Sequence, residues 1–492
     1  MKIVDLHALN SVLDRIIMTS PLSEVSETLK SLGQDHLLAW WPELSEAEQQ
    51  SLLQQIQAVD FSTVQSVWSK SQVAASPTDA AAADDGVARA DIAAAPQTVV
   101  RQPVSAEDHE LWEAATVVGN QLLSDGKVAV ITVAGGQGSR LGFEHPKGMY
   151  QIGPATDRTL FQIFAEQIQA RKLRHGGEIP WLIMTSSATH DETEQFLQAN
   201  SFFGLDPASV FLFQQGSMPA VDAATGKVLM SDKGTLCLSP DGHGGLVTAL
   251  KTSGLLDKMA SMNVEHFFYH QVDNPTVIMC DPALLGLHHQ HDSQLTTNVV
   301  KKVSPMERMG VLVDMNGHLE IIEYSELNEE QASREDASGQ WIFWAGNTAI
   351  HVFTRTFFEE LTNDGCQLEL HLASKKVACL QDDGTLLEPT EPNANKFERF
   401  IFDALPLAKN ALIVEGNRDR EFNPVKNAEG SDSPATSKAA MNRIFREWAL
   451  AAGLQVADNV DLEISPLHAL DEAEFTARVA DGTLKVSDIC GG

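Results

Sequence analysis

The chain alternates short apolar runs with helical patterns from about residue 106 onward, and this alternation constrains its fold most. Strand-like runs lie at 128–134, 181–185, 210–213 and 266–272. Helical patterns lie between them at 159–173, 192–199 and 245–262. This spacing predicts an α/β fold, with a mixed, mostly parallel sheet and helices on both faces. In such sheets, binding sites lie beyond the carboxyl ends of the strands.

The residues before this region have a different character. Apolar residues recur at helical spacing between residues 22 and 70, which predicts a small helical N-terminal part. Residues 71–105 are rich in Ala with Pro, Gly and Asp, so we interpret them as a linker or a poorly ordered strap. We therefore expect an N-terminal helical region with a linker at 1–105, a large catalytic domain at 106–405 and a small C-terminal domain at 406–492.

Composition excludes several classes of partner. The 492 residues contain 35 Lys and Arg against 67 Asp and Glu, a net charge of −32. Binding to nucleic acid or to an anionic membrane needs a basic face, so neither is expected. No stretch of 18 apolar residues occurs, and Asp5 and Asp14 interrupt the N-terminus, which predicts a cytoplasmic protein. Five cysteines without a CxxC pair predict reduced thiols and no zinc site.

The first strand leads directly into a glycine-rich loop. Lys127–Ala134 is followed by Gly-Gly-Gln-Gly-Ser-Arg-Leu-Gly and then by Pro146-Lys147-Gly148. Closely spaced glycines let backbone N–H groups approach phosphate oxygens. The spacing fits neither the dinucleotide-binding fingerprint nor the P-loop, which argues against an NAD-dependent oxidoreductase. Arg140 and Lys147 supply the cations that a loop holding a triphosphate needs.

The block AGGQGSRLGFEHPKGMY, residues 134–150, closely resembles the signature of eukaryotic-type UDP-N-acetylglucosamine pyrophosphorylases, within the UTP:sugar-1-phosphate uridylyltransferase family. The resemblance covers about residues 22–467 and includes the blocks at 213–216, 239–245, 272–274, 323–326, 345–347 and 421–427. It implies a Rossmann-like, GT-A-like nucleotidyltransferase domain with Mg²⁺ as cofactor. The implied reaction joins UTP and a hexose 1-phosphate reversibly to form a UDP-sugar and pyrophosphate.

The resemblance also implies roles for particular residues. Arg140 and Lys147 would stabilise charge on the phosphoryl groups. The nucleotide would be held by Ala134, Gly135, Gly136, Gly138, Ser139, Gln215, Gly242, Asp273 and Lys396. Gln215 and Gly242 would contact the uracil edge, and Ser139 keeps the hydroxyl of the threonine usual in the family. Asp273 would also bind Mg²⁺, since a carboxylate suits this ion, although it could simply cap the turn before Pro275.

A second set of residues is expected to contact the sugar and its phosphate. This set comprises His243, Gly310, Glu323, Asn347 and Lys426. Phe400 and Phe402 alternate in the sequence, which predicts that both rings lie on one face of a strand. They resemble the apolar wall near the N-acetyl group in the family, and a role in the core is an equal alternative.

Two departures from the family pattern leave the sugar open. His243 lies where the N-acetylglucosamine enzymes usually have Asn, and the UDP-glucose and broad-specificity enzymes commonly have His there. Trp344 replaces a residue that is usually Asn. The flanking blocks and the N-terminal helices are nevertheless similar to those of the N-acetylhexosamine enzymes. The resemblance therefore implies N-acetylglucosamine 1-phosphate as the substrate, with glucose 1-phosphate or another hexose 1-phosphate as the alternatives. An inactive regulatory protein that binds nucleotide sugars is the alternative from a different class, although the loop residues it would be expected to lose are present. The sequence predicts no oligomeric state.

Overall fold

The computed structural model describes residues 22–74, 85–363 and 365–485. The chain divides into two compact units, each made of three segments. The first unit takes Met1–Asp79, Ser217–Asp241 and Leu370–Glu398, and the second takes Ala80–Gly216, Gly242–Glu369 and Arg399–Gly492. This partition does not coincide with the expected parts 1–105, 106–405 and 406–492, because two insertions share an apolar core with the N-terminal helices.

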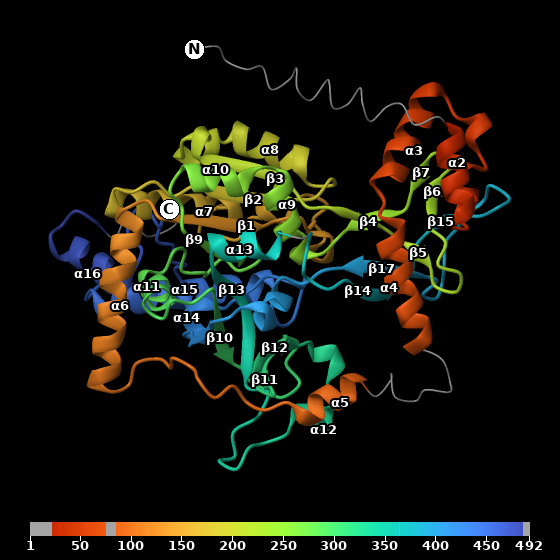
Figure 1. Ribbon diagram of the computed structural model, residues 1–492. Coiled ribbons are helices and arrows are strands. Elements are labelled where there is room, and N and C mark those ends of the chain that lie inside the picture. The colour runs from red at the N-terminus through yellow and green to blue at the C-terminus, as the bar shows by residue number, and fades with distance from the viewer. Residues whose placement is uncertain (1–21, 75–84, 364, 486–492) are drawn as a thin grey trace. The chain divides into compact units, whose positions relative to one another are not determined.

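A mixed sheet forms the centre of the second unit (Figure 1). Its strand order is β12-β11-β13-β9-β1-β2-β3, and β10 pairs with both β13 and β18. The run β9-β1-β2-β3 is parallel, and β13 lies antiparallel beside β9, which confirms the predicted α/β architecture. The strands are β1 (Val128–Val133), β2 (Trp181–Thr185), β3 (Val210–Gln214), β9 (His266–Gln271), β10 (Leu295–Lys301), β11 (Val311–Met315), β12 (His318–Ile322), β13 (Ala345–Thr354) and β18 (Ala411–Glu415).

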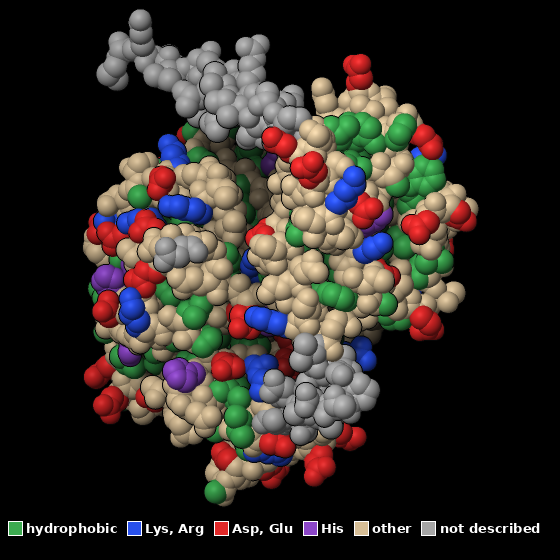
Figure 2. Space-filling view, turned by 45° about the vertical axis from the view of Figure 1, so that its right-hand side comes forward, with side chains coloured by type: hydrophobic (Ala, Val, Ile, Leu, Met, Phe, Trp, Pro, Cys, Tyr) green, Lys and Arg blue, Asp and Glu red, His purple; other side chains and the backbone are tan. Residues whose placement is uncertain are grey.

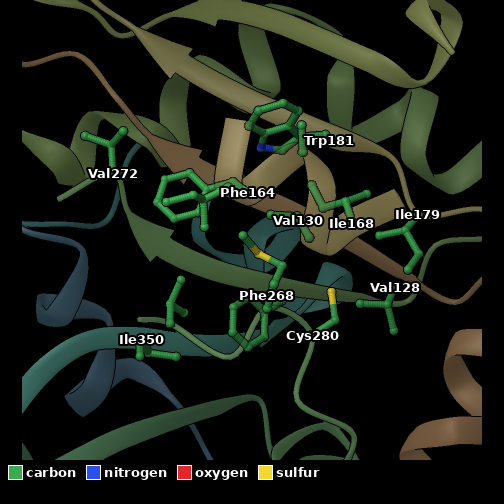
Figure 3. Close-up of a cluster of buried hydrophobic side chains, with 14 of the residues drawn as sticks. Val128, Val130, Phe164, Ile168, Ile179, Trp181, Phe268, Val272, Cys280 and Ile350 are labelled. Atoms are coloured by element: carbon green, nitrogen blue, oxygen red, sulfur yellow. The ribbon is translucent and has the colours of Figure 1, made fainter. Parts of the chain in front are cut away.

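Helices cover both faces of this sheet, because side chains alternate along the strands. Val128 and Val130 of β1 pack in one apolar cluster with Phe164 of α7, as Figure 3 shows, whereas Ala129 and Ile131 pack in a second cluster. The helices of the unit are α5 (Asp85–Ile92), α6 (Ala106–Ser124), α7 (Leu160–His175), α8 (His190–Ala199), α9 (Leu246–Thr252), α10 (Leu255–Ser261), α11 (Pro282–Gln290), α12 (Glu329–Ala332), α13 (Arg355–Leu361), α14 (Arg418–Glu421), α15 (Pro434–Ala451) and α16 (Glu472–Ala480).

The predicted strands and most predicted helices match these bounds to within two residues, but one helix is wrong. The segment 245–262 forms two helices, α9 and α10. Gly254 lies between them with φ +73°, in the left-handed region that glycine adopts readily, so the chain turns there.

The predicted linker at 71–105 is also wrong over the part that the structure describes. Residues 75–84 lie outside the described residues, but α4 continues to Ala74 and α5 forms from Asp85. The chain then forms two isolated β-bridges to the main sheet. Ala94 pairs with Asp314 of β11, and Val100 pairs with Val414 of β18. Ala90 and Ala93 of this segment are buried with Val311 and Val313 of β11. Composition alone does not indicate this packing.

The predicted C-terminal part, 406–492, is continuous with the second unit. Its strand β18 runs parallel to β10 in the main sheet. Val425 and Met441 belong to the same apolar cluster as β1. Only the end of this part, with Trp448 of α15 and Phe475 of α16, forms a smaller cluster of its own.

The first unit contains the predicted N-terminal helices. Its core joins Leu29 and Leu52 of the helices to Val221 and Phe397 of the two insertions. Ser45 and Glu48 form a capping box at the start of α3. The elements are α2 (Leu22–Ser31), α3 (Glu46–Ala58), α4 (Phe61–Ala74), β4 (Ser217–Pro219), β5 (Val221–Asp222), β6 (Met230–Asp232), β7 (Thr235–Leu236), β8 (Leu238–Pro240), β14 (His371–Lys375), β15 (Cys379–Leu380), β16 (Leu386–Leu387) and β17 (Ala394–Glu398).

The surface carries charges of both signs. On the face drawn in Figure 2, acidic side chains are interspersed with basic ones over the residues that are coloured by type. Among the described helices, none is long and apolar enough to span a membrane. Cys237, Cys280, Cys366 and Cys379 are free thiols, and Cys490 lies outside the described residues.

Candidate active site

The glycine-rich loop leaves the carboxyl end of β1 and closes on itself. Lys147 N donates to Gly136 O at 3.1 Å, and Gly138 N donates to His145 O at 2.9 Å. Within the described part of the chain, the N–H groups of Gly135 and Gly136 donate to no protein acceptor. The loop therefore has a fixed shape and offers backbone donors that suit phosphate oxygens.

Lys147 and Asp273 are brought together from the segments that follow two adjacent parallel strands, β1 and β9. Lys147 Nζ lies 3.9 Å from Asp273 Oδ2 and 3.5 Å from Val425 O. Val425 N in turn donates to Asp273 O at 2.8 Å. Both side chains are largely buried, with 19% and 15% exposed. The expected phosphate-neutralising cation and the expected metal ligand thus form one site.

Gln215, Gly242 and Gly135 meet in the same unit. Gln215 Nε2 donates to Gly242 O at 3.3 Å. Gly242 has φ +84°, which a glycine adopts without strain. A Cβ at position 135 would lie 2.3 Å from Gln215 Oε1, so glycine is required for this approach. The geometry places the two residues expected at the uracil edge beside the loop expected at the phosphates.

A cleft of about 670 Å³ lies in the second unit, a volume suited to a small-molecule ligand. Six of the predicted site residues line it: Arg140, His243, Gly310, Glu323, Asn347 and Lys426. Asn347 N donates to Gly310 O at 2.9 Å, which ties β13 to the start of β11. The five residues expected to bind the sugar and its phosphate are therefore collected from five separate segments.

The other predicted residues do not line this cleft. Ala134, Gly135, Gly136, Gly138, Ser139, Lys147, Gln215, Gly242 and Asp273 belong to the second unit but lie outside the cleft lining. Lys396 belongs to the first unit, in β17, where it lies opposite Ala373 of β14.

Glu323 and Lys426 have opposite charges in the cleft. Burial, reinforced by the nearby Glu326, raises the pKa of the Glu323 carboxyl, and Lys426 partly opposes the rise. The backbone N–H of Glu323 donates to Glu326 Oε1 at 2.9 Å. A buried acceptor beside a cation suits a ligand that carries both hydroxyl groups and a phosphate.

The ring of His243 is held in a fixed orientation. Ile401 N donates to His243 Nδ1 at 3.1 Å, so the neutral ring carries its proton on Nε2. Burial lowers the pKa of His243 to about 4, and the ring is therefore neutral near pH 7. His243 can thus offer a neutral N–H donor to the cleft.

Two aromatic predictions need correction. Phe400 and Phe402 do not lie on a strand, because β17 ends at Glu398 and a 3₁₀ helix begins at Ile401. Their rings nevertheless stack, with centroids 5.1 Å apart, and Phe402 lines the cleft. Trp344 does not line the cleft. It is 3% exposed, and the Arg101 guanidinium lies 4.1 Å from the centroid of its ring.

Sequence reasoning missed several cleft residues. The wall also contains Glu307, Arg308, Tyr324, Arg418 and Asp432. Arg418 and Asp432 flank the block 421–427, which the resemblance had already singled out, so they could have been found by extending that block. Glu307 and Arg308 lie in a segment without a recognised motif.

The Asp273 carboxylate is an oxygen donor of the kind that Mg²⁺ prefers. The described residues contain no group of three or more His, Cys, Asp or Glu arranged to hold a metal ion. Mg²⁺ is commonly held by one or two carboxylates together with substrate phosphates, and the Asp273 carboxylate beside the glycine loop matches that pattern.

The comparisons with known proteins agree along most of the chain. Residues 82–483 match the family model described as UTP–glucose-1-phosphate uridylyltransferase. A human UDP-N-acetylhexosamine pyrophosphorylase-like protein 1 is 36% identical over 450 residues, covering 88% of this chain and 87% of the relative. The UDP-N-acetylglucosamine pyrophosphorylase of Saccharomyces cerevisiae is 34% identical over 466 residues, covering 90% and 94%.

The fold is also found in a solved structure. The uridine diphosphate N-acetylglucosamine pyrophosphorylase of Trypanosoma brucei, solved with an inhibitor, superposes with a TM-score of 0.77. The match covers 94% of this chain and 96% of that one at 24% identity, and it supports the fold alone. On the family match and the two relatives, this chain belongs to the UTP–glucose-1-phosphate uridylyltransferase family.

Proposed function

We propose that the protein is a uridylyltransferase that converts UTP and N-acetylglucosamine 1-phosphate to UDP-N-acetylglucosamine and pyrophosphate. A phosphate oxygen of the sugar phosphate forms a bond to the α-phosphorus of UTP, while the bond from that phosphorus to the pyrophosphate oxygen breaks. The observation that carries this proposal is the convergence of Lys147 and Asp273 beside a glycine loop that has free backbone donors.

The protein contributes positioning and charge neutralisation, since the reacting groups are both anions. We assign Arg140 and Lys147 to the phosphates of UTP. Backbone groups of Ala134, Gly135, Gly136, Gly138 and Ser139 would surround the nucleotide. Gln215 and Gly242 would recognise uracil, since an amide can both donate to and accept from a pyrimidine.

Mg²⁺ is the proposed cofactor. The Asp273 carboxylate would hold it, and the ion would supply positive charge against the phosphates. The nearby Lys147 Nζ, 3.9 Å from Asp273 Oδ2, would share that neutralisation.

N-acetylglucosamine 1-phosphate is the preferred substrate in this proposal because the human and yeast relatives bear names of the N-acetylhexosamine type. Gly310, Glu323, Asn347 and Lys426 would hold the sugar and its phosphate. Glucose 1-phosphate is the second candidate, because His243 places a neutral N–H donor in the cleft where the N-acetylglucosamine enzymes usually have Asn.

The test is a direct assay of products. Protein, UTP and Mg²⁺ are mixed with one hexose 1-phosphate at a time, and released pyrophosphate is measured. We expect the highest kcat/KM with N-acetylglucosamine 1-phosphate. A higher value with glucose 1-phosphate would select the second candidate. Binding of UTP without any release of pyrophosphate would instead identify a regulatory protein that has lost catalysis.

The cytoplasm is our proposed location. Free thiols at Cys237, Cys280, Cys366 and Cys379 suit a reducing compartment. Cell fractionation with an antibody to the protein would test this, and recovery from a membrane or secreted fraction would contradict it.

A further inference from the structure

One wall of the cleft is a short segment, Lys302–Gly310, that carries an arginine to which no role has been assigned. The segment connects β10 to β11 and supplies seven residues of the cleft lining: Val303, Ser304, Met306, Glu307, Arg308, Met309 and Gly310. It matches none of the motifs recognised in the sequence. Its position beside the expected sugar contacts makes its chemistry relevant to substrate binding.

Contacts on both sides of Arg308 hold the segment in place. Glu307 forms an ion pair with Arg418 and accepts from Val303 N at 2.8 Å. Met309 on the other side is 5% exposed and packs with Val300 and Phe422. Because both neighbours are anchored, the backbone that presents Arg308 is pre-organised, and little ordering entropy remains to be lost when a ligand binds.

Four cations line the cleft: Arg140, Arg308, Arg418 and Lys426. Arg140, which is assigned to UTP, has no hydrogen bond or ion pair among the described residues, and the other three differ in how far they are already engaged. Arg418 is committed to Glu307 and to Lys301 O, to which its Nη1 donates at 3.0 Å. Lys426 lies close enough to Glu323 and Asp432 to stabilise both carboxylates. Arg308 has no hydrogen bond or ion pair with any residue that the structure describes. Its guanidinium is therefore available to a ligand.

The surroundings of Arg308 indicate which ligand group it meets. Gly310 lies two residues further along the wall, and its carbonyl accepts from Asn347 N at 2.9 Å. A Cβ at position 310 would lie 2.9 Å from Glu323 Oε1. Arg308 thus shares a wall with the sugar contacts, whereas Lys147 and Asp273 lie outside the cleft lining.

We infer that Arg308 binds the phosphate group of the hexose 1-phosphate, an assignment that rests on the proposed function. A guanidinium can donate two parallel hydrogen bonds to a phosphate, which fixes both the position and the orientation of the attacking group. The cleft also contains Glu307, Glu323 and Asp432, so a dianionic phosphate needs an uncommitted cation there.

The experiment compares Arg308→Ala, Arg308→Lys and the wild type by initial rates in both directions. We expect Arg308→Ala to raise the KM for N-acetylglucosamine 1-phosphate about tenfold, as loss of a charge-assisted contact predicts, with the KM for UTP changed less than about twofold. Arg308→Lys should recover part of the loss, since it keeps the charge but not the planar fork. Arg443→Ala is the matched control, because Arg443 is a half-exposed arginine on α15 outside the cleft.

Two outcomes overturn the assignment while the wild type remains active. An unchanged KM for the sugar phosphate in Arg308→Ala would show that the guanidinium does not contact it. A raised KM for pyrophosphate in the reverse reaction, with an unchanged KM for the sugar phosphate in the forward reaction, would show that Arg308 contacts pyrophosphate instead. Calorimetric titration with N-acetylglucosamine 1-phosphate, without turnover, should show the same tenfold weakening. A wild type that releases no pyrophosphate with any hexose 1-phosphate would instead refute the proposed function itself.

Discussion

The glycine loop at 134–150 and the cleft wall at 302–310 represent two ways of building a binding surface. The loop is closed by hydrogen bonds between residues close in sequence, such as Lys147 N to Gly136 O. The wall is held by partners far along the chain, Arg418 and Phe422 among them. Local closure leaves a recognisable sequence pattern, whereas assembly from distant segments does not. The loop could therefore be recognised from the sequence, whereas in the wall only Gly310 was predicted.

The largest effect is expected in the loop. Lys147→Ala should lower kcat by more than about tenfold, because it removes one charge-stabilising contact from the phosphoryl groups. Steady-state kinetics with UTP and N-acetylglucosamine 1-phosphate measure this. The control is Lys172→Ala: Lys172 lies on α7 and forms an ion pair with Glu178, and its loss should leave kcat unchanged. A loss of less than about twofold in Lys147→Ala would give Lys147 a structural role only.

The next prediction concerns Asp273, which faces the loop. Asp273→Asn should raise the Mg²⁺ concentration needed for half-maximal rate by about tenfold, since the neutral amide is a weaker ligand for this ion. Titration of the rate with Mg²⁺ measures the shift, with Asp257→Asn, an exposed position on α10, as the control. If the Mg²⁺ requirement stays the same, Asp273 caps the turn before Pro275 and binds no metal.

A smaller effect is expected at His243. His243→Asn should shift the ratio of kcat/KM values toward N-acetylglucosamine 1-phosphate over glucose 1-phosphate by about threefold to tenfold, the scale of one altered polar contact. Because burial lowers the pKa of His243 to about 4, the wild-type ratio should stay constant from pH 6 to 8. His318→Asn, on an exposed position of β12, is the control. A ratio that varies with pH in the wild type would contradict the assignment of a neutral ring.

The smallest effect is expected on stability, and it concerns Glu421, a buried residue five positions before Lys426. Burial, reinforced by Asp281, raises the pKa of Glu421 to about 7, and Asn298 Nδ2 donates to its Oε2 at 3.0 Å. The folded state therefore binds the proton more tightly than the unfolded state. This contribution to stability is present in full at low pH and is lost as the pH rises toward 7.

We expect Glu421 to contribute a decrease of about 1–2 kcal/mol in the free energy of unfolding between pH 5.5 and pH 8. Urea unfolding at both pH values measures it. Glu421→Gln, which cannot ionise, should show a smaller decrease, and Glu447→Gln on the exposed face of α15 should behave as the wild type does. Equal pH dependence in wild type and Glu421→Gln would mean that Glu421 titrates normally.

Much of the fold could be predicted because its signals are local. The strand at 128–133 has an uninterrupted β-branched and apolar pattern, and both of its faces are buried. The helix break at Gly254 was missed because the apolar pattern continues through it. The order of the segment 85–102 was missed because its bridges to Asp314 and Val414 depend on residues more than 200 positions away.

The site divides in the same way. Gln215 and Gly242 were predicted from short blocks, and the structure brings them into contact. Arg308 was not predicted, because the sequence around it gives no sign of its surroundings. Nothing there indicates that Glu307 and Met309 are held by distant partners while the Arg308 side chain has none among the described residues. Trp344 was singled out as a departure from the family pattern that bears on the sugar, because it adjoins Ala345-Gly-Asn347 in sequence. The structure instead buries Trp344 against Arg101, outside the cleft lining.

The three-segment composition of the first unit has a consequence for synthesis on the ribosome. Leu29 and Leu52 are made early, but Phe397, which completes their core, is made more than 300 residues later. At ordinary elongation rates of about 5–20 residues per second, the N-terminal helices wait on the order of tens of seconds with an unfinished apolar face. During that interval this apolar face is exposed to the risk of aggregation that chaperones counter.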